Sequence, residues 1–387
     1  MAAVVLALVV LAAALAVAVG RPSPAAAAAP PPPPPVAAKA YVVMDQRTGV
    51  VLASKNPDER LPMASTTKIM TGYLALQHFQ DLSTMVTARR DSIGVGEDEI
   101  YLHKGEKLSV DDLLKAVLIQ SANDAAADLA DGVAGSQKAF VALMNSEARK
   151  LGLTNTHYTN PHGLDEPGHY TSAMDLTRLA RLAMRDPRFA GYVSTYHTTI
   201  PWRGRPYRRE LYSHNWLLNT YHWIYGVKTG WTDEAGYCVA AAGRYDGRPI
   251  MVTVLGEPDD AHRMRDVLRL FRWSPSQYET KVLVQAGAVL AHTAVPYHDE
   301  GLDLVAARTV KADVRVEAVP TESVKAPAQV ALPVTRGTAA GRASFSADGV
   351  RVGGTPLLAA SSYPKATWTT RVGYQLHRAW KRIVSFF

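Results

Sequence analysis

Six consecutive prolines, Pro30–Pro35, divide the chain into a short first part and a long second part. Proline has no backbone N–H and a fixed φ, so this run is excluded from helices and sheets and should form a stiff polyproline spacer. We assign residues 30–39 to this linker and expect the folded part to start near Ala40. The chain of 387 residues is too long for one ordinary domain, so two or three units are expected.

The segment before the prolines has the pattern of an export signal. Residues 1–19 are entirely apolar, and an alanine-rich stretch with A-x-A sites follows at Ala25–Ala29. Its length would also suit a retained membrane span, and no Lys or Arg precedes Arg21. We expect residues 1–29 to be a cleaved signal peptide and the protein to be exported.

Residues 40–276 predict one α/β unit, because β-rich runs enclose a helical stretch. Two hairpins are indicated, the second around the strong turn signal Asp246-Gly247. Their predicted strands are Ala40–Asp45 with Gly49–Ser54, and Tyr237–Arg244 with Arg248–Leu255. Helical periodicity covers Ile69–Leu76, Val110–Ile119 after a capping box of Ser109 with Asp112, Lys138–Leu151 and Ala173–Met184.

The pattern changes beyond Trp273, where Val314, Val316 and Ala318 alternate with polar residues and Pro and Gly recur. This predicts a small β domain at residues 277–361.

Residues 364–387 predict an amphipathic helix, because basic residues fall opposite an apolar arc. The arc contains Trp368, Val372, Leu376, Trp380, Ile383, Val384, Phe386 and Phe387. Such a helix can pack on its own protein, but two tryptophans and a basic opposite face favour attachment to an anionic membrane surface. We expect a peripheral membrane anchor.

The formal charge of +7 is concentrated at the C-terminus, where five basic residues and no acidic one follow residue 363. The remainder is nearly neutral, so nucleic-acid binding is not indicated. The single cysteine, Cys238, excludes an internal disulfide and lies in the apolar run Tyr237–Ala242. It is expected to be a small buried hydrophobe.

Ser65 and Lys68 form an S-x-x-K pattern that leads directly into the predicted helix Ile69–Leu76. A spacing of three places both side chains on one helical face. The positive end of the helix dipole disfavours an ammonium and stabilises an alkoxide, so Lys68 can act as a neutral base toward Ser65. Alone, the pattern is weak, because a surface serine and lysine at this spacing are common.

Two further motifs follow, Ser121-Ala122-Asn123 and Lys228-Thr229-Gly230. The first, alone, suits a helix cap, whereas Gly230 on a strand would allow a close backbone approach to a ligand. S-x-x-K, S-x-N and K-T-G in this order are the active-site set of penicillin-recognising serine enzymes. Ala122 stands where the usual motif has Asp, which is compatible if only the flanking Ser and Asn matter.

Residues 40–387 resemble the low-molecular-mass penicillin-binding proteins of the serine-type D-alanyl-D-alanine carboxypeptidase family, most strongly in 40–275. The resemblance rests on Met63–Met70, Asn160–Leu164 and Tyr225–Gly230. It implies an α/β fold of the penicillin-binding transpeptidase and β-lactamase type: an antiparallel sheet flanked by helices, with a helical subdomain. The small all-β domain and the C-terminal amphipathic helix follow. No metal or organic cofactor is implied.

The resemblance also implies the catalytic roles. Ser65 attacks the carbonyl between the last two D-alanines of a peptidoglycan stem peptide, and Lys68 takes its proton. Ser121, bridging between the lysines, relays a proton to the departing amine. Asn123 holds the substrate's amide and orients Lys68. β-Lactams are expected to acylate Ser65 as inhibitors.

The substrate-binding set follows from the same resemblance. Lys228 and Thr229 meet the terminal carboxylate of the substrate, and Gly230 lies beside them. Backbone N–H groups of Ser65 and Trp231 stabilise the tetrahedral oxyanion. Together with export and the C-terminal helix, this places the enzyme at the outer face of the cytoplasmic membrane.

Other polar clusters suggest less specific roles. His157, His162 and His169 are spaced for loops, and no H-E-x-x-H motif occurs, which disfavours a zinc site. The loop at residues 162–167 is expected near the rim of the site without a catalytic role. Four arginines before the K-T-G motif are expected to form a solvated basic loop. They are Arg203, Arg205, Arg208 and Arg209.

Two alternatives remain open at this point. A β-lactamase would need a dedicated deacylating base, for which Glu166 is the only candidate, and its Asp-Glu-Pro setting resembles the carboxypeptidase loop instead. A non-catalytic wall-binding or penicillin-sensing module is the second, although intact Ser65, Lys68, Ser121 and Lys228 argue against loss of chemistry.

Overall fold

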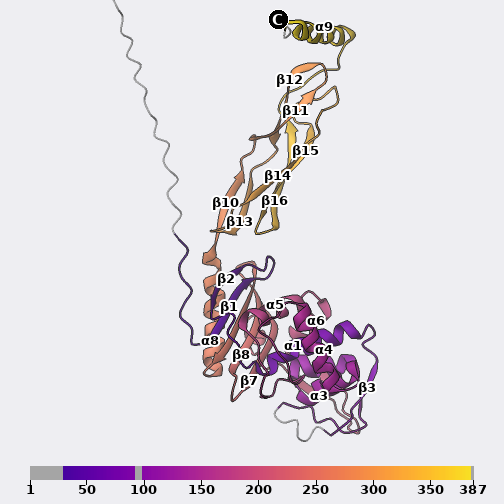
Figure 1. Cartoon of the computed structure of the whole chain (residues 1–387), viewed down its shortest axis with the longest axis vertical. Coiled ribbons are helices and arrows are strands. Elements are labelled where there is room, and N and C mark those ends of the chain that lie inside the picture. Colours follow the sequence, from indigo (N-terminus) through magenta and orange to yellow (C-terminus); the bar gives the residue numbers. More distant parts are fainter. Residues whose placement is uncertain (1–28, 92–97, 385–387) are drawn as a thin grey trace, which may run out of the picture.

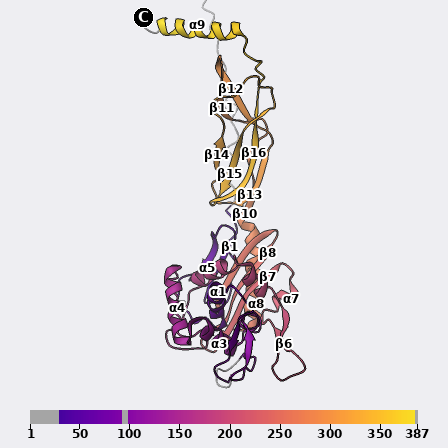
Figure 2. The same cartoon turned by 90° about the vertical axis from the view of Figure 1, so that its right-hand side faces the viewer.

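The computed structural model describes residues 29–91 and 98–384. The predicted signal peptide, up to residue 28, and the predicted helix residues Phe386 and Phe387 lie outside this part. An N-terminal unit of helices and strands is followed by an elongated β unit, and helix α9 lies across the far end of that β unit (Figures 1 and 2).

The N-terminal unit is built on a five-stranded, fully antiparallel sheet. In spatial order its strands are β2 (Val51–Lys55), β1 (Ala40–Asp45), β9 (Arg248–Glu257), β8 (Gly236–Tyr245) and β7 (Ile224–Thr232). Both predicted hairpins are therefore present. The central strands are apolar on both faces, because helices cover the sheet on both sides.

The two faces of the sheet have separate hydrophobic cores. On β1, Val42 packs into the core that contains helix α5 (Ala173–Ala183), whereas Val43 packs into the core that contains helix α8 (Asp260–Trp273). Cys238 of β8 is fully buried in the first core, as predicted, and burial raises the pKa of its thiol to about 11. The periodicity of α8 was not recognised from sequence.

A helical cluster lies on the α5 side of the sheet (Figure 1). It contains α1 (Lys68–His78), α2 (Val110–Lys115), α3 (Asn123–Ala134), α4 (Gln137–Lys150) and α6 (Pro187–Val193). The predicted cap of α2 is present, because the Asp112 amide donates to Ser109 Oγ at 3.1 Å. The predicted helix 110–119 continues beyond α2 as a π-helical turn, η2 (Ala116–Gln120).

Short elements complete this unit. They are the 3₁₀ turns η1 (Ala64–Thr67) and η3 (Ser274–Gln277), the pairs β3 (Met85–Thr87) with β4 (Lys107–Ser109) and β5 (His197–Ile200) with β6 (Arg209–Tyr212), and α7 (Leu217–Thr220).

The β unit consists of two antiparallel sheets around its own apolar core. The smaller sheet consists of β10 (Tyr278–Val284) paired with β13 (Val310–Arg315). The larger has the order β11 (Val289–Val295), β12 (His298–Ala306), β16 (Val350–Ala359), β15 (Ala339–Ala347) and β14 (Thr321–Lys325). At the junction with the N-terminal unit, Tyr278 donates to Asp45 at 2.6 Å, and Arg248 donates to Asp313 at 2.8 Å.

The proline run has no helix or strand, as expected, but it packs along α8. The carbonyl of Pro31 accepts hydrogen bonds from Trp273 Nε1 at 3.0 Å and from Gln277 Nε2 at 3.3 Å. The Ala37 amide donates to Asp266 at 2.8 Å. Ordered contacts therefore begin before Ala40, where the sequence led us to expect the start of the folded part.

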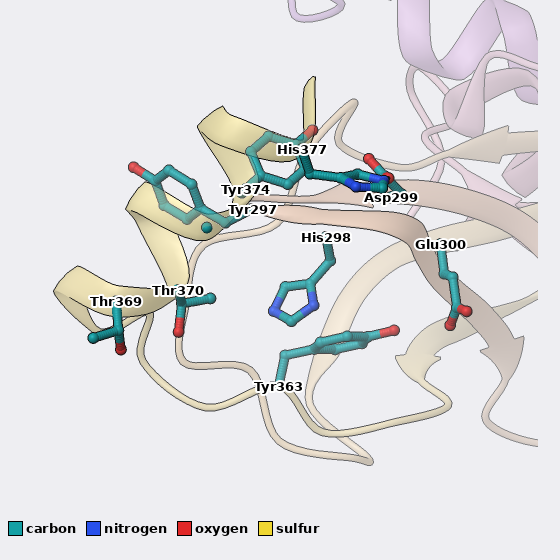
Figure 3. Close-up of a pocket in the computed structure, with 10 residues that line it drawn as sticks. Tyr297, His298, Asp299, Glu300, Tyr363, Thr369, Thr370, Tyr374 and His377 are labelled. Carbon is teal, nitrogen blue, oxygen red and sulfur yellow. The ribbon is translucent and has the colours of Figure 1, made fainter. Parts of the chain in front are cut away.

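Helix α9 (Trp368–Val384) contacts the β unit through its polar side. Lys381 Nζ lies 3.0 Å from the carboxylate of Asp299, and the guanidinium of Arg371 lies 5.4 Å from the ring centre of Tyr297. Figure 3 shows this contact region, where Tyr374 and His377 of α9 approach Tyr297 and Asp299. No helix in the described ranges has both the length and the apolar character to cross a membrane.

Candidate active site

Ser65 lies in the 3₁₀ turn η1, one turn before Lys68 begins α1. Lys68 Nζ is 2.8 Å from Ser65 Oγ, so the predicted pair is in direct contact. Ala64, which precedes the serine, has φ of +49°, an uncommon value for a residue with a side chain. A backbone conformation of this kind persists where the surrounding structure holds it. The structure around Ala64 therefore also holds Ser65 in position.

Lys68 is completely buried. Besides contacting Ser65, its Nζ donates to Asn123 Oδ1 at 2.6 Å and to the backbone carbonyl of His162 at 2.7 Å. These two carbonyl oxygens accept hydrogens from the amine and hold its nitrogen beside Ser65. Asn123 therefore contacts Lys68 directly, and the His162 carbonyl adds a partner that the sequence did not reveal.

The loop at residues 162–167 lies closer to the nucleophile than predicted. We expected it near the rim, but it packs beneath the nucleophile: a Cβ at Gly163 would stand 2.1 Å from the Ala64 carbonyl oxygen. His169 Nε2 is 2.7 Å from Thr67 Oγ1 in the same turn. Burial lowers the pKa of His162 to about 3 and that of His169 to about 4, so both rings are neutral at physiological pH. Gly163 and His169 therefore both pack against the turn η1 and support it.

Ser121 follows the π-helical turn η2 and adopts a left-handed conformation, with φ of +71°. π-helical turns inside α-helices often occur at functional sites. The turn directs Ser121 Oγ toward Lys228 Nζ, at 2.9 Å. We expected Ser121 to bridge the two lysines, and the hydrogen bond to Lys228 forms one side of that bridge.

Lys228 is nearly buried on β7. Burial lowers the pKa of Lys228 to about 8. The charge of Asp98 opposes this shift, and the charge of Arg263 adds to it. Its Nζ also donates to the Thr229 carbonyl at 3.0 Å. A buried cation next to the Thr229 hydroxyl and a solvent-accessible cleft is suited to bind a carboxylate.

The K-T-G strand reaches the nucleophile through its glycine. A Cβ at Gly230 would stand 2.8 Å from the Ser65 amide nitrogen, so only glycine permits this approach. The next residue, Trp231, is 43% exposed at the mouth of the cleft. Gly230 therefore brings the strand that carries Trp231 against the turn that carries Ser65, the two residues whose N–H groups are predicted to form an oxyanion hole.

A cleft of about 470 Å³ joins these groups. It is lined by Ser65, Asp98, Ser121, His214, Thr229, Gly230, Trp231, Tyr237, Asp260 and Arg263. Five of these residues were not predicted from sequence: Asp98, His214, Tyr237, Asp260 and Arg263. Only the last two had a readable signal, because they lie three residues apart on α8, whose apolar residues Met264, Val267, Leu268 and Phe271 have helical spacing.

Arg209 and Glu166, both singled out in the sequence, lie outside the described lining of this cleft. Arg209 is not part of a solvated basic loop: it is buried and forms two hydrogen bonds with the buried carboxylate of Glu106, at 2.6 and 3.0 Å. Glu166 is exposed and accepts a hydrogen bond from Asn160 at 3.1 Å. Glu166 is absent from the described residues that line the cleft.

Comparison with known proteins agrees with this geometry. The sequence profile of the Peptidase S11 family, described as D-alanyl-D-alanine carboxypeptidase, matches residues 25–259. The chain is 33% identical to D-alanyl-D-alanine carboxypeptidase DacC of Escherichia coli, over 87% of each chain. It is 30% identical to DacF of Bacillus subtilis, over 86% of this chain and 87% of the relative.

Solved structures give the same result. Penicillin binding protein 5 from Haemophilus influenzae superposes with a TM-score of 0.63 at 27% identity, covering 87% of this chain and all of that one. The predicted fold class and the predicted family are thereby confirmed. The chain belongs to the Peptidase S11 family of D-alanyl-D-alanine carboxypeptidases and has the fold of the low-molecular-mass penicillin-binding proteins.

Proposed function

We propose that this protein is an exported serine D,D-carboxypeptidase that removes the terminal D-alanine from peptidoglycan stem peptides through an acyl-enzyme on Ser65. The observation that carries the proposal is the 2.8 Å contact between Ser65 Oγ and the fully buried Nζ of Lys68. Two carbonyl oxygens, those of the Asn123 side chain and the His162 backbone, also accept hydrogen bonds from that nitrogen and hold it beside the nucleophile.

The first half-reaction follows from these contacts. Lys68 takes the proton of Ser65, and Ser65 Oγ bonds to the carbonyl carbon between the last two D-alanines. Negative charge on the carbonyl oxygen is stabilised by the backbone N–H groups of Ser65 and Trp231. As the C–N bond breaks, Ser121 passes a proton to the departing amine, and D-alanine leaves.

The terminal carboxylate of the substrate is held by Lys228 and Thr229. Because Lys228 is hydrogen-bonded to Ser121, the group that binds the carboxylate also positions the hydroxyl that serves the leaving amine. Water then attacks the acyl-enzyme with Lys68 and Ser121 as the available acid-base groups. A β-lactam carries the same carboxylate next to a reactive amide, so penicillin acylates Ser65 and inhibits the enzyme.

Placement at the outer face of the cytoplasmic membrane is part of the proposal. The apolar side chains of α9 are exposed, with Trp368 at 76%, Leu376 at 66% and Trp380 at 65%. The polar side contacts Asp299 and Tyr297 of the β unit. A helix held in this way presents its aromatic and aliphatic side chains to a lipid surface.

A β-lactamase is less well supported, because the exposed Glu166 is bound to Asn160 and does not line the cleft. The test is incubation of the full chain with a synthetic peptide ending in D-Ala-D-Ala and, separately, with penicillin. The proposal predicts D-alanine release that is lost in Ser65→Ala, with a long-lived penicillin adduct. Rapid penicillin turnover without D-alanine release would identify a lactamase. The absence of both D-alanine release and penicillin turnover would identify a sensor.

A further inference from the structure

A second cleft, of about 560 Å³, lies where the N-terminal unit meets the β unit (Figure 1). We name it the junction cleft. Among the described residues, it shares no lining residue with the cleft of Ser65. Along β8, the run from Cys238, which pairs with Gly230, to Arg244 of the junction cleft measures roughly 20 Å at about 3.4 Å per residue. The junction cleft is therefore separate from the active site.

Four arginines line the junction cleft, and they come from both units. Arg47 lies between β1 and β2, Arg244 lies on β8, and Arg248 begins β9. The fourth, Arg351, lies on β16 of the β unit. All of them except Arg248 are exposed. Positive charges from the two units are therefore gathered around one concave space.

The aspartates that line this cleft are already bound within the protein. Asp246 and Asp313 both pair with Arg248, at 2.5 and 2.8 Å. Asp45 is buried, and one of its oxygens accepts a hydrogen bond from Tyr278 at 2.6 Å. Arg248 thus has two carboxylate partners, and these contacts hold the junction together.

The other three arginines have no carboxylate partner within 4 Å among the described residues. Arg244 donates to the Gly247 carbonyl at 3.3 Å, and Arg351 donates to the Gly353 carbonyl at 3.4 Å. These carbonyls satisfy single N–H groups but do not neutralise the charges. Like charges around a cleft repel one another, and a concave surface of one sign attracts counter-ions. An anion held between the guanidinium groups would remove this repulsion.

The lining indicates what kind of anion fits. A guanidinium group binds phosphate oxygens through two parallel N–H donors. Three such groups offer more donors than one phosphate group can use, and the volume is in the range of sites that hold sizeable ligands. Pro249, Ala312 and Val352 add an apolar wall that can contact the carbon skeleton of a phosphate ester. The cleft therefore suits a ligand with several phosphate groups.

We propose that the junction cleft binds an anion that carries two or more phosphate groups, and that this anion bridges the two units. Arg47 and Arg244 hold it from the N-terminal unit, and Arg351 holds it from the β unit. Two direct hydrogen bonds across the junction, Tyr278 to Asp45 and Arg248 to Asp313, already connect the units. The bridging anion adds a third connection and restricts the orientation of the β unit relative to the catalytic unit.

The test titrates the full chain by isothermal calorimetry with two probes that share this chemistry. One is pyrophosphate, a small soluble anion, and the other is a short poly(glycerol phosphate) chain, a polymer with phosphodiester links. At least one probe is expected to bind, more weakly at higher salt. The probe that binds more tightly identifies the source of the phosphate groups. Arg244→Ala and Arg351→Ala are each expected to weaken binding about tenfold and to leave D-alanine release unchanged.

Arg342→Ala is the matched control, because Arg342 is an exposed arginine of the β unit, on β15, outside the junction cleft. It should change the affinity less than twofold. Failure of both probes to bind overturns the inference. A loss of affinity in only one of Arg244→Ala and Arg351→Ala also overturns it, because the anion would then contact one unit alone. An equal loss in Arg342→Ala would show a general charge effect and overturn it as well. None of these outcomes bears on the carboxypeptidase, which is tested by D-alanine release.

Discussion

Gly230 packs directly against the backbone of Ser65: a Cβ at position 230 would stand 2.8 Å from the Ser65 amide nitrogen. This contact brings strand β7 and the turn η1 together, although the two residues are far apart in sequence. It explains why the third position of K-T-G needs glycine, and in the proposed mechanism it brings the oxyanion donors of both segments toward one atom.

Gly230→Ala is expected to separate β7 from η1 and to lower kcat/KM for D-alanine release by about 100-fold, because small misplacements of catalytic groups have effects of that size. The penicillin acylation rate should fall in parallel. Gly191→Ala is the control, since a Cβ there meets no heavy atom of the described residues within 4 Å. Near-normal acylation by Gly230→Ala would show that this approach does not set the oxyanion geometry.

The pKa of Lys228 predicts that the activity falls at alkaline pH. Burial lowers this pKa to about 8, so the free enzyme carries the charge below that pH and loses it above. Because this charge binds the substrate carboxylate in the proposed mechanism, kcat/KM should decrease as the pH rises through about 8. Lys228→Arg keeps its charge, so its kcat/KM, although lower, should lack this decrease. A decrease that persists in Lys228→Arg would assign it to another group.

The buried pair of Arg209 and Glu106 predicts a large effect on stability. Arg209→Ala leaves the Glu106 carboxylate buried without its partner, which should cost about 3–5 kcal/mol in the free energy of unfolding measured with urea. Arg208→Ala, in the same hairpin but exposed, should change that free energy by less than about 0.5 kcal/mol. Equal values for the two variants would contradict the structural role given to Arg209.

Much of the N-terminal unit was readable from sequence, and the reasons are local. The strands of the two hairpins and α1, α4 and α5 have clear periodicity, and the Ser109 cap marks the start of α2. The π-helical turn before Ser121 was not readable, because no side-chain pattern distinguishes it from the end of an α-helix. That turn nevertheless sets the direction of the Ser121 hydroxyl.

The site was readable where it depends on residue type and hidden where it depends on backbone or distant pairing. Lys68, Asn123 and Lys228 were found through their motifs. The His162 carbonyl bonded to Lys68 was missed, because a backbone oxygen has no signature in sequence. Arg209 was misread as solvated, because Glu106 lies 103 residues before it.

The exposed apolar side of α9 predicts membrane attachment. Removal of residues 367–387 should shift the signal-cleaved protein from the pellet to the supernatant when it is sedimented with anionic vesicles, with an unchanged rate of D-alanine release. Asp299→Asn is the control: it weakens the contact with Lys381 and leaves the apolar side intact, so binding should persist. Continued sedimentation of the truncated protein would refute the anchor.

The central claim, that Ser65 is the acylated nucleophile, is tested most directly by locating the penicillin adduct by mass spectrometry of the digested protein. One equivalent of adduct is expected on the peptide that contains Ser65, with none on Ser65→Ala. An adduct on another residue, or full labelling of Ser65→Ala, would contradict the account.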